Sequence, residues 1–461
     1  MKLRPIFLST VLLLLTGCSL GPDFAVPGVS AGRTWKQSAA SQSAALPDRW
    51  WRLFSDAELN RLVDRAITAN NDIAAARARR NTARALVGVD RARLFPQLDL
   101  NSGSSINRAS DDSAAPGQDL ETRNYQSTFD LSYDLDLWGA NRRSIETAEA
   151  EADSAEALLV AQRLGIASEV ARQYFTLRGL DAQESILSET ISTREDSLSL
   201  EQSRTDAGLA DGLSSSRART ELELARSDIA IVQRQRGSAE HALAVLCGAR
   251  PSDFSVSKKA TSGGLPVISP GLPAVVIARR PDMHAAEQTL RAANARIGVA
   301  EAAFYPKIQL TGSAGLESLN AASFLDWENR VLSLGAGLAA PLIDGGTNRS
   351  NYAASRSRYE ESLATYRQTL LVALREVEDA LVDLKGLARS RAALEAAVTS
   401  AADTRSLSFQ RYEKGLSSYL EVVDAERSVL QSRLALAEVD AQQRVSLTAL
   451  ARALGGGWSR K

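Results

Sequence analysis

The chain has 461 residues, and at about 150 residues per domain this length predicts about three domains. Its 54 lysines and arginines against 55 acidic residues leave a net charge of −1, which excludes a general electrostatic attachment to nucleic acid. Two histidines, two cysteines and two methionines exclude most zinc, iron–sulfur and thioether copper sites. Aromatic residues are only 5%, so we expect close-packed helices rather than a bulky aromatic core.

The N-terminus is typical of a bacterial lipoprotein signal. A positively charged start precedes an apolar stretch at residues 6–15, which is too short to span a bilayer. The junction before Cys18 resembles a lipobox, after which cleavage leaves a cysteine that carries acyl chains. We expect removal of residues 1–17, lipid on Cys18 and an extended segment over 18–54. The alternative is an ordinary signal peptide with an incidental cysteine.

The rest of the chain contains two similar copies of one unit. We therefore expect a duplicated unit instead of the three domains suggested by length. We expect the first copy over 55–248 and the second over 274–457. A linker rich in Ser, Gly and Pro, 249–273, separates them, and 458–461 form a C-terminal tail. The matched positions include Phe95-Pro96 with Tyr305-Pro306, Gly139 with Gly346, Gly179 with Gly386, and Gly208-Leu209 with Gly415-Leu416.

Each copy is predicted to contain a helix, two strands, a long helix, a glycine turn and a returning helix. Residues 142–206 and 349–413 lack proline, and each stretch would reach about 98 Å as a helix at about 1.5 Å per residue. Glycines at 179 and 386 interrupt both stretches at the same relative place, which indicates a bend or close packing. The turns at 208 and 415 are the tips of the two hairpins.

Four segments alternate apolar and polar residues. This period of two is typical of strands with one apolar face and one solvent-exposed polar face. They are expected at about 97–106, 128–138, 307–316 and 333–342. Such segments fit transmembrane barrel strands, and the alternative is a half-buried soluble sheet. Four strands cannot close a barrel, so several chains must contribute. Three chains would give twelve strands and a water-filled passage, which the polar faces favour over the eight strands of two chains.

Several motifs together resemble the outer membrane factor (TolC-like) family, in its lipoprotein branch. They are the lipobox, Gly21-Pro22-Asp23-Phe24, Trp50-Trp51, Arg280-Pro281-Asp282 and Ala303-Phe304-Tyr305-Pro306. The resemblance implies a mainly α-helical homotrimer with a twelve-stranded transmembrane β-barrel and a long periplasmic helical tunnel. It also implies a Gram-negative outer-membrane channel that expels drugs or other small molecules from an inner-membrane pump through a periplasmic adaptor.

The same resemblance assigns roles to residues of this chain. The tips Gly208-Leu209 and Gly415-Leu416 resemble those that contact the adaptor, although every long helical hairpin needs such a turn. Residues 419–427 resemble the stretch that closes the periplasmic mouth. This match implies constricting rings at Leu420 and Asp424 with Arg427 as a nearby partner, whereas the residues alone indicate an ordinary solvated helix face. Two departures from the commonest pattern make this mouth more acidic, Glu421 and Glu426.

The repeat adds a charge relation at this mouth. An offset of 207 places Arg217 opposite Asp424 and Arg219 opposite Glu426, and we expect converging tips to form a ring of alternating charge. No catalytic motif, phosphate loop or metal-ligand set is present, so we expect neither an enzyme nor a cofactor other than covalent lipid. The rival function is a lipid-anchored coiled-coil scaffold without a pore, which would leave the alternating strands unexplained.

Overall fold

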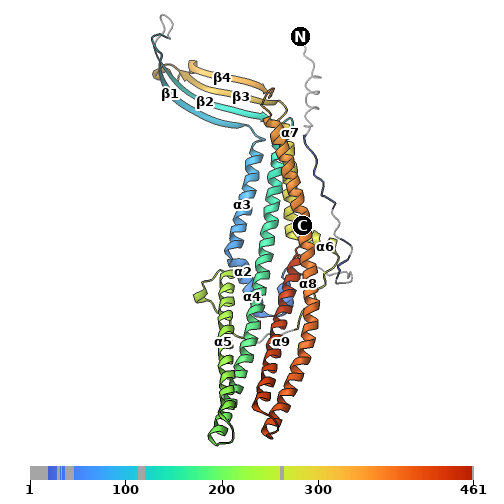
Figure 1. Ribbon diagram of the computed structural model, residues 1–461. Helices are drawn as coiled ribbons and strands as arrows, with labels where there is room; N and C mark the ends of the chain where they lie inside the picture. The colour runs from blue at the N-terminus through green and yellow to red at the C-terminus, as the bar shows by residue number, and fades with distance from the viewer. Residues whose placement is uncertain are drawn as a thin grey trace. The chain divides into compact units, whose positions relative to one another are not determined.

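The structure is a computed structural model that describes residues 19–28, 32, 34–36, 46–112, 120–259 and 264–458. Two compact units are present. The first contains the described residues of Met1–Pro27, Arg79–Glu156 and Ala285–Tyr366, and the second those of Gly28–Ala78, Ala157–His284 and Arg367–Lys461. A four-stranded sheet belongs to the first unit, and the second is mainly helical (Figure 1). In the part of the chain that is described, no helix has both the length and the apolar character of a membrane span.

The helices and strands occur twice, in the same order, along the chain. The long helices α4 and α8 have 67 residues each, the returning helices α5 and α9 have 35 each, and α3 and α7 have 22 each. The elements are α2 (Ala57–Ala69), α3 (Asn71–Ala92), β1 (Gln97–Arg108), β2 (Glu121–Leu135), α4 (Ala140–Asp206), α5 (Gly212–Leu246), α6 (Pro273–Ala278), α7 (Pro281–Ala302), β3 (Lys307–Ser318), β4 (Arg330–Ala339), α8 (Thr347–Glu413) and α9 (Tyr419–Ala453).

The four strands form one antiparallel sheet in the order β1-β2-β3-β4, seen as a curved layer in Figure 1. Its register aligns the apolar positions of all strands: Leu131 of β2 lies opposite Leu98 of β1 and Gly312 of β3, which in turn lies opposite Leu334 of β4. Because side chains alternate along a strand, these positions share one face. The other face is polar, and the Asp130 carboxylate there accepts hydrogen bonds from Asn101 at 2.5 Å and Ser313 at 2.6 Å.

The strand boundaries differ from those expected from alternation. β2 begins at Glu121 rather than near 128, because a polar stretch without apolar alternation is held by backbone pairing to the far end of β1. It ends at Leu135 rather than at 138, since the Asp136 carboxylate accepts the backbone N–H groups of Asn141 and Arg142, both at 3.0 Å, and so caps α4. β4 covers Arg330–Ala339 rather than 333–342, because Pro341 has no N–H to donate to a ladder.

The expectation of a core without bulky aromatics was wrong for the second unit. Trp50, Trp51, Phe54, Tyr174 and Phe175 are all buried there in one hydrophobic cluster. The rings of Phe54 and Phe175 lie 4.7 Å apart, and the Tyr174 hydroxyl donates to the Asp56 carboxylate at 2.7 Å. The prediction from composition was wrong because the chain has few aromatic residues but gathers several of them in one cluster. This cluster fixes the short segment before α2 against α4.

The two helix-interrupting glycines have different surroundings. A Cβ added at Gly179 would lie 2.6 Å from the Cβ of Ala441 on α9, so glycine permits close approach of α4 and α9. At Gly386 a Cβ would contact nothing within 4 Å. Close packing therefore explains the first glycine only.

Candidate functional site

Both hairpin tips close by the same backbone geometry. Gly208 and Gly415 have φ values of +71° and +70°, a left-handed conformation that favours glycine. The N–H of the next residue donates back over the turn, from Leu209 to the carbonyl of Arg204 at 2.8 Å and from Leu416 to that of Arg411 at 2.9 Å. Leu209 is 75% exposed and Leu416 is 67% exposed. Each tip therefore offers an apolar side chain that its own chain leaves uncovered.

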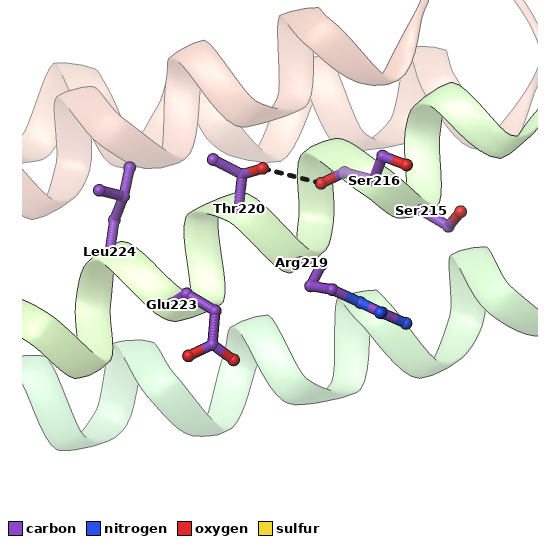
Figure 2. A pocket seen from close by; sticks show the side chains of 6 residues that line it. All are labelled: Ser215, Ser216, Arg219, Thr220, Glu223 and Leu224. Atoms are coloured by element: carbon purple, nitrogen blue, oxygen red, sulfur yellow. Dashed lines mark hydrogen bonds between the residues drawn. The ribbon is translucent and has the colours of Figure 1, made fainter.

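A shallow pocket of about 610 Å³ lies on α5 just beyond the first tip (Figure 2). In the figure, Arg219 and Glu223 project to one side of the helix and Thr220 and Leu224 to the other. The Thr220 hydroxyl donates to the Ser216 carbonyl at 2.9 Å. Arg219 was expected at the mouth from the repeat, but this surface, which combines hydroxyl, charged and apolar groups, was not predicted from the sequence.

The residues expected at the periplasmic mouth lie in the first turns of α9. Leu420 is 40% exposed, and the Asp424 side chain is more exposed still. Arg427 places Nη1 3.6 Å from the Asp424 carboxylate. The structure therefore brings Asp424 and Arg427 together within one chain. It describes a single chain, so the pairing of Arg217 with Asp424 between chains remains a prediction.

A buried carboxylate links three helices next to the residues expected at the mouth. Glu221 of α5 accepts from Nε of Arg427 on α9 at 3.1 Å and lies 3.0 Å from Nη2 of Arg194 on α4. The side chains of Glu221 and Arg194 are only 6% and 5% exposed. This cluster was not predicted from the sequence, because neither Glu221 nor Arg194 belongs to a motif and their partners are remote in the chain.

A second acidic group is buried among α4, α8 and α9. Glu426 has a side chain that is 12% exposed, and its carboxylate lies 3.7 Å from the Arg405 guanidinium. They line a small cavity of about 60 Å³ with Arg194, Glu189 and Arg433, and the last two pair at 2.7 Å. Burial raises the pKa of the Glu426 carboxyl above its ordinary value, since the loose contact with Arg405 only partly offsets desolvation.

Replacing Glu426 with glutamine is expected to flatten the pH dependence of stability. Because the folded pKa of Glu426 lies above the unfolded value, its contribution is complete below the unfolded pKa and is lost as pH rises through the folded pKa. Thermal midpoints measured across that range should fall less for Glu426→Gln than for the parent chain. The exposed Glu421→Gln variant is the control. Parallel curves for Glu426→Gln and the parent would contradict this assignment.

A tyrosine joins the two hairpins closer to the tips. The Tyr412 hydroxyl of α8 donates to the buried Glu201 carboxylate of α4 at 2.7 Å, and the Arg204 guanidinium lies 4.8 Å from the Tyr412 ring centre. Burial and the bond to Glu201 raise the pKa of Tyr412 to about 12. The tyrosine therefore stays protonated and remains a donor at physiological pH.

The described residues offer little nucleophilic or metal chemistry. They contain no group of three or more His, Cys, Asp or Glu side chains placed to hold a metal ion. Cys247 is buried at the end of α5, and burial raises the pKa of its thiol, so its reactive thiolate is disfavoured. The predicted signal peptide, 1–17, and the predicted lipid attachment site, Cys18, lie outside the described residues.

Known proteins resemble this chain over nearly its whole length. The family model described as "Outer membrane efflux protein" matches residues 62–249 and 272–456. Outer membrane protein OprJ of Pseudomonas aeruginosa is 34% identical over 99% of this chain and 97% of its own length. Cation efflux system protein CusC of Escherichia coli is 32% identical, with 98% of each chain covered. The solved outer-membrane channel OprN is 28% identical, with 96% of this chain and 100% of that chain covered and a TM-score of 0.89.

Proposed function

This chain belongs to the outer membrane efflux protein family, and from that membership we propose that it is the outer-membrane channel of an efflux system. It acts in the outer membrane of a Gram-negative cell as a passive exit duct for drugs or other small molecules. A periplasmic adaptor and an inner-membrane pump complete the tripartite system. The observation that carries the proposal is the sheet, whose register gathers apolar residues such as Leu98, Leu131 and Leu334 on one face and leaves the other face polar.

The edges of that sheet support pairing with other copies of the chain. Among the described strands, β1 and β4 each have one neighbour, so each leaves an open edge. Open edges are not tolerated in lipid, because each unpaired backbone group costs several kcal/mol. Pairing of β4 with β1 of another copy would satisfy both edges. We propose a homotrimer with a twelve-stranded barrel, in which the apolar face meets lipid and the polar face lines the passage.

The tips and the mouth receive the roles expected from the resemblance. We propose that the exposed leucines Leu209 and Leu416 contact the adaptor, together with the pocket on α5. Leu420 and Asp424 constrict the periplasmic mouth, with Arg427 as partner. Lipid on Cys18 anchors the N-terminus in the membrane.

Planar-bilayer recording of the purified protein tests the channel proposal. Discrete conductance steps are expected from a pore, whereas a lipid-anchored scaffold would leave the bilayer silent. Native mass spectrometry of the same sample tests the stoichiometry. A stable monomer or dimer as the sole species would rule out the twelve-stranded barrel.

Asp424→Ala is expected to raise single-channel conductance, because it removes a charge from the proposed constriction. Exposed ion pairs contribute only about 0–1 kcal/mol each, so closure requires threefold repetition and packing of Leu420. The double reversal Arg217→Asp with Asp424→Arg should restore much of the closed behaviour. If the double reversal leaks as much as the two single reversals combined, Arg217 and Asp424 do not pair between chains.

A further inference from the structure

The first residues that the structure describes, 19–23, are bound to the first unit; we call them the N-terminal strap. The Leu20 N–H donates to the carbonyl of Trp138 at 3.2 Å. Trp138 lies in the connection between β2 and α4. The strap is therefore held at the point where the sheet continues into the long helix.

Two buried side chains bind successive groups of the strap. Arg143 of α4, with a side chain 7% exposed, donates from Nε to the Leu20 carbonyl at 3.0 Å and from Nη2 to the Gly21 carbonyl at 3.2 Å. The same Nη2 reaches the Asp23 carboxylate at 3.2 Å. Asn294 of α7 is also buried and donates from Nδ2 to the Pro22 carbonyl at 2.7 Å. Every residue from 20 to 23 is thus contacted by one of two side chains.

Glycines allow the strap backbone to approach the neighbouring backbone so closely that a Cβ at these positions would clash. Gly21 has a φ of +91°, and a Cβ there would lie 2.5 Å from the Cα of Gly298 on α7. A Cβ at Gly298 would lie 2.6 Å from the Leu20 carbonyl oxygen. At Gly139, which has a φ of +77°, it would lie 2.9 Å from the Cα of Ser19. Backbone meets backbone on both sides of the strap.

We propose that Arg143, Asn294, Gly139 and Gly298 form a binding site for the N-terminal strap, and that docking of this peptide, rather than the acyl chain, completes the sheet–helix junction for assembly. Arg143 also donates from Nη1 to the Glu146 carboxylate at 2.8 Å, and without the strap this bond would remain while those to residues 20, 21 and 23 would be lost. Asn294 would lose the Pro22 carbonyl as its acceptor. Buried donors without acceptors destabilise a fold. The strap thus acts as a part of the first unit that the chain supplies from outside the repeat. Lipid at position 18 is one residue from Ser19 and adds a membrane tether to a segment that is already bound.

A matched pair of glycine variants separates docking from simple loss of fold. Gly21→Ala places a Cβ against the Gly298 backbone, whereas a Cβ at Gly28 meets nothing within 4 Å. Both substitutions lie in the terminal segment, outside the helices and strands. In the full-length protein in detergent, Gly21→Ala is expected to speed hydrogen exchange of the Leu20 amide by about tenfold, the order of the effect of losing its hydrogen bond to the Trp138 carbonyl. Gly28→Ala should exchange as the parent does.

Assembly in cells is then compared with and without lipid. The Cys18→Ser variant is expressed with a signal peptide of the ordinary, non-lipoprotein kind, and loss of the palmitate label confirms that it carries no lipid. It should yield as much outer-membrane trimer as the parent. Gly21→Ala should lower the trimer yield in both backgrounds. Normal assembly of Gly21→Ala, or a defect confined to the Cys18→Ser background, would overturn the proposal. Failure of Cys18→Ser alone would assign the role to the acyl chain. This inference concerns assembly. A chain that assembles but conducts no current would therefore refute the proposed channel function and leave the proposed role of the strap intact.

Discussion

Glu221→Ala is expected to destabilise the helical unit by about 3–5 kcal/mol, the range for removing one partner from a buried ion pair. The substitution leaves the buried Arg194 guanidinium without its carboxylate and removes the bond from Arg427 Nε. Arg194 would retain its donation to the Glu221 backbone carbonyl, which alanine also has. The measurement is the shift in the thermal or urea midpoint of the purified protein.

Glu223→Ala is the matched control, because it lies two positions along the same helix. Glu223 is exposed and pairs with Arg226 at 3.0 Å, so its removal should change the midpoint little. Equal shifts for Glu221→Ala and Glu223→Ala would mean that the buried bridge between α4, α5 and α9 contributes no more than a surface pair. Since Arg427 belongs to the proposed mouth, Glu221→Ala is also expected to raise conductance.

Leu131→Arg is expected to cost about 2–4 kcal/mol of insertion free energy, the range for arginine on the lipid face near the bilayer midplane. The register places Leu131 in the middle of the apolar face, between Leu98 of β1 and Gly312 of β3. Leu135 shares this face but is the last residue of β2, so arginine there should cost less. The quantity to measure is the fraction of protein folded into the outer membrane or into lipid vesicles.

Asp134→Asn is the control for the opposite face of the same strand. Asp134 pairs in register with Gln309 on the polar side, so its neutralisation should leave insertion intact and alter ion selectivity. If Leu131→Arg inserts as well as Asp134→Asn, the apolar face does not meet lipid. The sheet would then be a soluble one, and the barrel proposal would fail.

Periodicity along the sequence was sufficient for the long and returning helices and for the number of strands, but not for the additional helix, α2 or α6, that precedes α3 or α7 in each copy. The proline-free stretches predicted at 142–206 and 349–413 lie within α4 and α8, which both have 67 residues. These features are local, because helix periodicity and turn glycines act over a few neighbours. The boundaries of β2 depend on residues distant in the chain or in another element. Glu121 belongs to the strand because it pairs with Arg108, and Asp136 lies outside it because its carboxylate caps α4. The choice between competing backbone partners depends on what lies alongside.

The duplication and the turn glycines at 208 and 415 could thus be predicted from the sequence alone. Which charged side chains are buried, and which partners they contact, depends on the packing of the helices. Nothing near Glu221 in the sequence distinguishes it from Glu223, yet the first meets Arg194 and Arg427 from two other helices and the second stays exposed. Likewise, Arg143 resembles its neighbour Arg142 in sequence, yet Arg143 binds the N-terminal strap and Arg142 pairs with Asp136. Burial depends on helices and segments distant in the chain, so it was settled only when the fold brought them together.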